Sequence, residues 1–222
     1  MQQIDKRLSQ AFPPNSKNNS SYIAEIHSVL ANVKIDDIGF KDIKFRTVQT
    51  KRDIAQLKLL QKEWFPINYT EQFYTAVLNG YVSSLLAEIE IKFPSGRKEK
   101  YIIGVMVYQS RQSKSKYQQN LNWKQWFCSL FQQKNALYIM TIGVINEFRG
   151  RGIAEYMIDQ LKQRVLDSNK TLIYIYLDMV VYNEVAARFY QKNGFNRVGI
   201  KKNHYSIEDQ QFDAYVYVWQ PQ

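Results

Sequence analysis

Residues 145–161 read INEFRGRGIAEYMIDQL, a stretch in which a glycine–arginine turn leads directly into a helical pattern. Apolar residues recur every fourth position from Ile153 to Val165, which predicts an amphipathic helix over 149–167. The first turn of a helix exposes backbone N–H groups without internal partners, and their dipoles sum to a partial positive charge. Glycines let an anion approach this backbone, and arginines add full charges. The turn is therefore predicted to bind a phosphate group.

The class of phosphate ligand is narrowed by what the turn lacks. A Walker-type nucleotide loop requires Gly-Lys followed by Ser or Thr, which is absent here. A dinucleotide fingerprint requires a third glycine, and Glu155 occupies that position. An isolated RGRG would also fit an ordinary solvated helix start. The binding interpretation is favoured because the turn follows the nearly all-apolar segment 137–145.

The segments around the turn predict an α/β (α+β) fold with a mixed central sheet of about six to seven strands and flanking helices. Apolar strands at 137–145 and 172–181 flank the helix, and such a strand–helix–strand crossover makes its two strands parallel. Upstream, Thr50 and Asp53 form a capping-box pattern at a helix start. The other expected elements are a helix near 70–79, a hairpin of strands 81–93 and 100–109, a helix capped by Asn183, and strands 195–202 and 212–219.

The composition is that of one domain with appendages, and we divide the chain into a partly flexible N-terminal extension, 1–38, and a domain, 39–222. No apolar run is long enough for a membrane-spanning helix, and the first residues lack the apolar block of a secretory signal. One cysteine and two distant histidines predict no disulfide framework and no metal site. We expect an intracellular, cytoplasmic protein, without excluding an organelle.

The net charge of +10 is concentrated in one region. Between Gly96 and Ala136, eight Lys/Arg residues stand against the single acid Glu99. Within this region, 110–135 reads as an insertion that combines a basic loop with an aromatic helical face. Such a segment suits a membrane surface or a protein partner. The alternative is an insertion whose aromatic residues pack on the domain itself. Nucleic acid is disfavoured because the sequence shows no separate binding module.

The turn also resembles the cofactor motif of a known family. Residues 149–154 fit the (Arg/Gln)-x-x-Gly-x-(Gly/Ala) motif of the GCN5-related N-acetyltransferases, or GNAT superfamily, in which this turn binds the pyrophosphate of acetyl-coenzyme A. A downstream run from Asn183 to Phe195 is similar to the family's second cofactor motif. The resemblance implies a GNAT fold, in which the strand–helix–strand crossover holds the cofactor. The implied cofactor-binding residues are Ile142, Gly143, Val144, Arg149, Gly150, Arg151, Gly152, Ile153, Ala154, Asn183 and Tyr190.

Several further stretches resemble the N-alpha-acetyltransferases of the NatF type and the NatE catalytic subunit. In those enzymes a Phe-Pro-aliphatic-x-Tyr loop, matched by residues 65–69, holds the first residue of a peptide, and a late aromatic hairpin covers the peptide backbone. The resemblance implies a protein N-terminus as substrate, with a hydrophobic first residue such as Met. Taken singly, these aromatic residues would equally fit a hydrophobic core. The implied substrate-binding residues are Phe65, Pro66, Ile67, Tyr69, Tyr138, His204 and Tyr205.

The implied catalytic residues are Tyr138, Asp178 and Tyr190. The relatives use a tyrosine and a histidine on the two central strands, and this chain departs from them by placing Asp178 where the histidine belongs. Three roles remain open for Asp178: a base whose pKa is raised by burial, a carboxylate that attracts the substrate ammonium, and a satisfied polar residue at a strand end. Tyr190, whose alternative is a core aromatic, would protonate the departing thiolate.

The sequence leaves three functions open. The first is acetylation of protein N-termini, whose α-amine has a pKa of about 7.7–8.0 and needs little help from a base. The second is acetylation of lysine or of a small amine by the same fold. The third is a catalytically weak or inactive member of the fold that serves as a subunit of a larger assembly, because fold alone does not establish activity.

Overall fold

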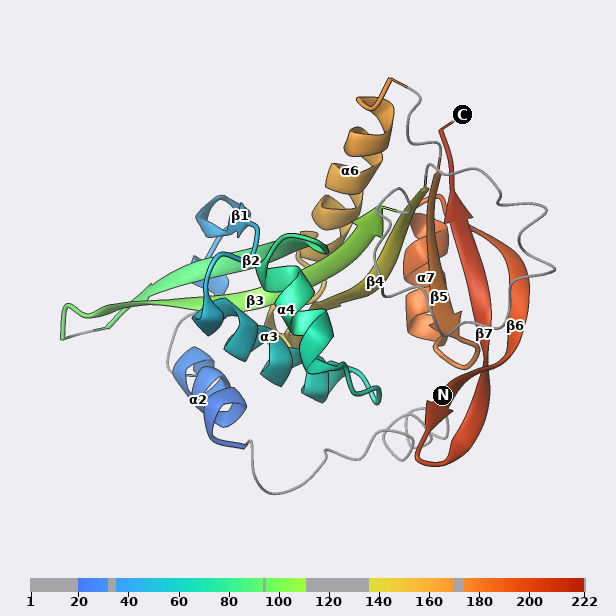
Figure 1. Cartoon of the computed structure of the whole chain (residues 1–222). Helices are drawn as coiled ribbons and strands as arrows, with labels where there is room; N and C mark the ends of the chain where they lie inside the picture. The colour runs from blue at the N-terminus through green and yellow to red at the C-terminus, as the bar shows by residue number, and fades with distance from the viewer. Residues whose placement is uncertain (1–19, 32–34, 94, 111–135, 170–173, 222) are drawn as a thin grey trace.

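The computed structural model describes residues 20–31, 35–93, 95–110, 136–169 and 174–221. A seven-stranded mixed sheet in the order β1-β2-β3-β4-β5-β7-β6 forms its centre, as expected from the sequence (Figure 1). The strands are β1 (Lys44–Arg46), β2 (Ser83–Lys92), β3 (Lys98–Ser110), β4 (Ala136–Val144), β5 (Tyr174–Val180), β6 (Asn196–Ile207) and β7 (Gln210–Trp219). The helices are α2 (Ser20–Ala31), α3 (Lys51–Trp64), α4 (Glu71–Leu78), α6 (Ile153–Leu166) and α7 (Glu184–Lys192), with 3-10 turns η1 (Ile35–Asp37), η2 (Phe40–Asp42) and η4 (Asn146–Phe148).

Helices α3 and α6 cover opposite faces of the sheet. On β3, a Cβ added at Gly104 would lie 3.3 Å from side-chain atoms of Ile153 and Met157 in α6. On β4, Gly143 points to the other face and lies directly against Trp64, the last residue of α3. In Figure 1, α3 and α4 lie in front of the sheet, and α6 rises behind them. The core is therefore a layered helix–sheet–helix structure, with helices packed on both sides of β3 and β4.

The two central strands separate halfway along their length. β4 and β5 are parallel, which confirms the expected crossover, but their pairing covers only Ala136–Ile139 with Tyr174–Leu177. The register between β3 and β4 skips Met140, so a bulge kinks β4 where the pairing stops. Beyond this point, β4 continues to Val144 without β5 beside it. The separation opens a notch in the sheet between β4 and β5.

Local sequence signals explain the helix α3. The Thr50 hydroxyl accepts a hydrogen bond from the backbone N–H of Asp53, and the Asp53 carboxylate accepts one in return from that of Thr50, which confirms the capping box. Asp53 also pairs with the Arg46 guanidinium, whose partner on β2 is Glu88. Hydrogen bonds from Arg46 and two backbone N–H groups outweigh the effect of burial and lower the pKa of Asp53 to about 2. The strand β1 is thereby tied to α3 and β2.

The helix that follows the glycine–arginine turn starts later than predicted. The expected helix began at Arg149, whereas α6 begins at Ile153. Gly150 and Gly152 have φ angles of 74° and 80°, and this left-handed conformation cannot continue a right-handed helix. The glycines therefore form a loop between η4 and α6 that leaves the first turn of α6 open at its N-terminal end.

The N-terminal helix α2 packs on the rest of the fold. Its residues Ile26 and Leu30 are buried in the common hydrophobic core. The imidazole of His27 contacts the carboxylate of Glu147 just before the glycine–arginine turn. Among the helices of the described ranges, none is long and apolar enough to cross a membrane. The insertion 110–135, expected to contact a membrane or partner, lies outside the described residues except for Ser110.

Candidate active site

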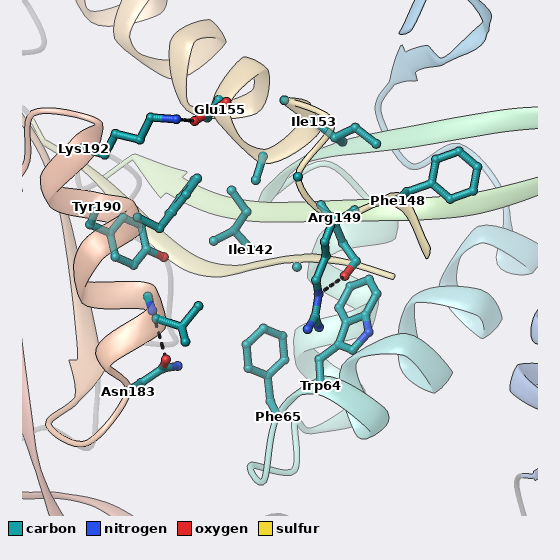
Figure 2. Close-up of a pocket in the computed structure, with 18 residues that line it drawn as sticks. Trp64, Phe65, Ile142, Phe148, Arg149, Ile153, Glu155, Asn183, Tyr190 and Lys192 are labelled. Carbon is teal, nitrogen blue, oxygen red and sulfur yellow. Dashed lines mark hydrogen bonds and ion pairs between the residues drawn. The ribbon is translucent and has the colours of Figure 1, made fainter. Parts of the chain in front are cut away.

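A cavity of about 550 Å³ opens where β4 and β5 separate. Its walls come from the end of α3, the glycine–arginine loop, the first turn of α6 and one face of α7. Figure 2 shows Trp64 and Phe65 on one side, facing Asn183 and Tyr190 on the other. Of the predicted cofactor-binding residues, all but Arg151 line this cavity: Ile142, Gly143, Val144, Arg149, Gly150, Gly152, Ile153, Ala154, Asn183 and Tyr190.

The glycine loop forms an open anion cradle at one wall of the cavity. Gly152 is the N-cap of α6, and its carbonyl accepts the first helical hydrogen bond, from Tyr156. A Cβ added at Gly150 would meet nothing within 4 Å, so the loop leaves free space beside its backbone. The N–H groups of the first helical turn have no partner inside the helix and point toward this space. A helix start of this geometry fits a phosphate group.

The two arginines of the loop have different surroundings. Arg149 lines the cavity, and its Nε donates a 2.9 Å hydrogen bond to the carbonyl of Val144 at the end of β4. Arg151 instead donates to the carbonyls of Ile35 and Ile38, at 3.0 and 3.4 Å, and pairs with Asp36 at 2.9 Å. The sequence assigned both to the cofactor, but the structure places only Arg149 in the cavity, while Arg151 holds the N-terminal segment.

Alanine substitution should separate these two arginines. We expect Arg149→Ala to weaken the binding of a phosphate-bearing cofactor about 10- to 100-fold, because a charge-assisted hydrogen bond contributes about 1.5–3 kcal/mol. Arg151→Ala should leave this affinity nearly unchanged but speed proteolytic cleavage before Ile43, since the segment there loses its anchor. Titration calorimetry and limited proteolysis measure the two effects. An equal loss of affinity in both variants would contradict the assignment.

The free edge of β4 offers backbone hydrogen bonds to the cavity. The N–H of Ile145 binds the carbonyl of Ile103 on β3. Backbone polar groups alternate between the two sides of a strand, so those of Val144 and Ile142 point away from β3, toward the notch. The side chain of Arg149 already uses the Val144 carbonyl. An extended ligand could therefore pair with Ile142 and the Val144 N–H as an added strand would.

An ion pair connects α6 and α7 beside the cradle. Glu155 in the first turn of α6 accepts a 2.6 Å hydrogen bond from Lys192, the last residue of α7, and both residues line the cavity (Figure 2). The sequence had identified Glu155 only as the residue that excludes a dinucleotide fingerprint. Lys192 was not predicted, because a lysine at a helix end has no signature that separates it from solvated lysines.

A second cavity, of about 180 Å³, continues from the first. Its lining is mostly apolar and includes the predicted peptide loop and the late hairpin. Five of the seven predicted substrate-binding residues line it: Phe65, Pro66, Ile67, Tyr69 and Tyr205. The other two, Tyr138 and His204, do not line it. Asp178 and Tyr190, two of the three predicted catalytic residues, also line it.

Asp178 is the centre of a polar cluster beneath the second cavity. Its Oδ2 lies 2.7 Å from Lys201 Nζ, 3.2 Å from the Tyr138 hydroxyl and 3.5 Å from His204 Nε2. The Tyr205 hydroxyl donates a 3.0 Å hydrogen bond to the backbone carbonyl of Asp178. Its other oxygen, Oδ1, is buried without a hydrogen-bond partner among the described residues. Tyr138 and His204 thus contact Asp178 but do not line the cavity themselves.

Lys201 was missed by the sequence interpretation. It lies on β6, and its side chain is 9% exposed while that of Asp178 is 4% exposed, so the two form a buried ion pair. Burial alone would raise the pKa of Asp178, but the hydrogen bond from His204 and the charge of Lys201 outweigh it and lower this pKa below its ordinary value. The carboxylate therefore stays ionised at neutral pH, which argues against the expected role as a base of raised pKa.

The tyrosines around the second cavity remain protonated. Burial, followed by the charge of Asp178, raises the pKa of Tyr138 well above its usual value. The same two causes act in the same order on the pKa of Tyr205, and burial alone raises the pKa of Tyr190. A phenol whose pKa is raised stays neutral at neutral pH and does not act as a base. The Asn183 side chain caps α7 by accepting from Ala186 N at 3.0 Å, which confirms its predicted cap.

Comparison with known proteins fits this geometry. A model of the acetyltransferase (GNAT) family matches residues 52–195. N-alpha-acetyltransferase 60 of Danio rerio is 27% identical over 168 residues, which cover 75% of this chain and 65% of that protein. Histone acetyltransferase MCC1 of Arabidopsis thaliana is 24% identical over 193 residues, which cover 83% of this chain and 76% of that protein.

A solved structure with a similar fold contains the predicted cofactor. The crystal structure of Arabidopsis thaliana NAA60 in complex with acetyl-CoA has a TM-score of 0.64 and 26% sequence identity to this chain. The similarity covers 80% of this chain and 98% of that one. The expected resemblance to N-alpha-acetyltransferases is confirmed by these relatives.

Proposed function

The chain belongs to the acetyltransferase (GNAT) family, whose cofactor is acetyl-coenzyme A, and on that premise we propose that it acetylates the α-amino group at the N-terminus of proteins. The observation that carries the proposal is the chemistry of the second cavity. Its ionisable lining residues are Asp178 and the tyrosines Tyr69, Tyr190 and Tyr205. The pKa of Asp178 is lowered and those of the tyrosines are raised, so no lining residue accepts a proton near pH 7.

A cavity without a strong base favours the more acidic amine. An α-amino group has a pKa of about 7.7–8.0 and is about half neutral near pH 8, whereas a lysine amine has a pKa of about 10.4 and is almost fully charged there. The α-amine can therefore attack after losing its proton to water. The unpartnered Oδ1 of Asp178 supports this role, because it can accept a hydrogen bond from the incoming amine or from the water that takes its proton.

We assign the residues of the two cavities separate roles in the transfer of the acetyl group. When bound, acetyl-coenzyme A supplies an activated acetyl group, whose C–S bond breaks as the amine nitrogen forms the new C–N bond. Backbone N–H groups at the free edge of β4 polarise the acetyl carbonyl. Tyr190 lines both cavities and stays protonated at neutral pH, which supports its role as the proton donor to the departing thiolate. Arg149 and the first turn of α6 hold the diphosphate.

The apolar lining supports a preference for a hydrophobic first residue. Phe65 and Ile67 line the second cavity from the loop after α3, and Tyr69 is stacked on Phe73 with ring centroids 4.7 Å apart. An acidic first side chain would lose its hydration here and meet the carboxylate of Asp178, whereas an apolar one would gain by burial. Methionine suits such a pocket because its unbranched chain adapts to irregular space.

A peptide with a blocked α-amine decides between the two amines. We expect transfer to a peptide that starts with Met and carries an internal lysine, and no transfer once its α-amine is formylated. Mass spectrometry of the products locates the acetyl group. Transfer to lysine in the blocked peptide would contradict the proposal and favour the alternative that the histone acetyltransferase relative suggests. A peptide starting with Asp is the matched control for the first residue.

A further inference from the structure

The two cavities meet at a junction where any transferred acyl group must lie. A group carried from a ligand in the first cavity to an amine in the second passes the residues that line both. Trp64 and Phe65 form one side of this junction, and α7 forms the other (Figure 2). The shared lining residues are Trp64, Phe65, Ile142, Asn183, Ala186 and Tyr190.

The indole ring of Trp64 packs directly against Gly143 on β4. A Cβ added at Gly143 would lie 2.8 Å from Trp64 Cζ3, 3.0 Å from Cδ2 and closer still to Cε3. Gly143 does not have a positive φ, so its backbone conformation does not demand glycine. The position instead requires glycine for space, because the indole ring occupies the volume that any other side chain would fill.

The indole ring cannot retreat from the junction easily. One turn earlier on α3, Gln61 Nε2 donates to Thr141 Oγ1 at 3.1 Å, and this buried bond fixes α3 against the same face of β4. The Trp64 Nε1 is itself buried without a hydrogen-bond partner among the described residues, so the ring is held by packing. A ring that is held in place and fills a junction sets the size of what passes through it.

We propose that Trp64 limits the acyl chain that the enzyme transfers to acetyl. This inference rests on the acyltransferase function proposed above and names the residue that determines its donor specificity. A propionyl group has one more methylene than acetyl, and at a close-packed site one methylene changes the specificity constant about 10- to 200-fold. Removing the ring frees space on the Gly143 side of the junction, so longer chains gain most from its removal.

The test compares acetyl-, propionyl- and butyryl-coenzyme A with wild type and Trp64→Ala. In wild type we expect kcat/KM to fall about 10- to 200-fold from acetyl to propionyl. In Trp64→Ala this ratio should approach one, and butyryl transfer should become measurable. Titration calorimetry measures the part of this preference that lies in binding of the acyl-coenzyme A, in which we expect wild type to favour acetyl and the variant to lose that preference. Trp64→Leu serves as a second variant with more of the original volume, in case Trp64→Ala does not fold.

Gly143→Ala tests the contact from the other partner. Alone, its added methyl should collide with the indole and lower kcat/KM for acetyl-coenzyme A at least about tenfold, since overfilled sites must distort. Combined with Trp64→Ala, the methyl has room, so the double variant should lose less than the sum of the single changes. Tyr81→Ala, which removes an aromatic residue that is 70% exposed, should leave the acyl ratio unchanged.

The results of these experiments distinguish a failure of the proposal for Trp64 from a failure of the proposed function. A folded Trp64→Ala that keeps the wild-type ratio of acetyl to propionyl, in kinetics and in calorimetry, overturns the inference. Wild type that transfers no acyl group to any peptide overturns the proposed function. In that case calorimetry still decides the role of Trp64, because the preference for acetyl must then appear in wild-type binding and disappear in the variant.

Discussion

Gly152→Glu should abolish the binding of acetyl-coenzyme A, with an increase in Kd of at least about 100-fold, which corresponds to about 2.8 kcal/mol. Gly152 is the N-cap of α6 with a φ of 80°, a conformation that L side chains rarely adopt. A glutamate here would strain the loop and place a carboxylate in the anion cradle, beside the existing carboxylate of Glu155. The diphosphate would then meet an added, unpaired negative charge where wild type offers partial positive charge.

Gly80→Glu is the matched control for this change. Gly80 follows the end of α4 and has a φ of 75°, and a Cβ there meets nothing within 4 Å. The same substitution brings the same backbone strain, of order 1–3 kcal/mol, and the same added charge, away from the cavity. We expect both variants to lose stability in urea denaturation and only Gly152→Glu to lose binding in calorimetry. Gly152→Glu that binds with wild-type affinity would show that the cradle does not hold the diphosphate.

The crossover and its turn could be predicted from the sequence because their signals are local. The spacing of apolar residues from Ile153 onward predicts the buried face of α6. Thr50 and Asp53 lie within four residues of one another and predict the start of α3. The predicted helix began four residues too early, at Arg149 instead of Ile153, because the apolar spacing does not mark where the helix starts. The φ angles of the two glycines decided the boundary instead.

The side-chain contacts within the site could not be predicted from the sequence. Arg149 and Arg151 are two residues apart, and no sequence pattern states that one faces the cavity while the other binds carbonyls of the N-terminal segment. Lys201 lies 23 residues after Asp178, and the two meet only because the sheet order β5-β7-β6 brings their strands within reach of one another. The sequence shows that Asp178 stands on β5 where the relatives have a histidine. It does not show that Asp178 forms an ion pair with Lys201.

Lys201→Met should destabilise the protein by about 3–5 kcal/mol, because it removes the cation that compensates the buried carboxylate of Asp178. Urea denaturation at pH 7 measures the loss. Lys202→Met is the matched control: Lys202 also lies 2.7 Å from an aspartate oxygen, that of Asp213, but its side chain is 78% exposed. Water replaces the lost partner there, so we expect little change in stability. Equal effects of the two variants would show that the Asp178 pair is not buried in solution.

A second substitution and a lower pH should both rescue Lys201→Met. Replacing Asp178 by Leu in that variant removes the uncompensated charge, and replacing both members of a buried pair by apolar residues is often nearly neutral. In wild type the lowered pKa of Asp178 contributes stability above the unfolded value of about 3.9, and this contribution disappears as the pH falls through the folded pKa. Without Lys201, burial is opposed by His204 alone, so the pKa of Asp178 rises from its wild-type value, and the carboxylate costs more stability at neutral pH and takes up a proton earlier on acidification. The stability difference between wild type and Lys201→Met should therefore shrink from pH 7 to pH 4.5, and a difference that stays constant would contradict the assignment of charge to Asp178.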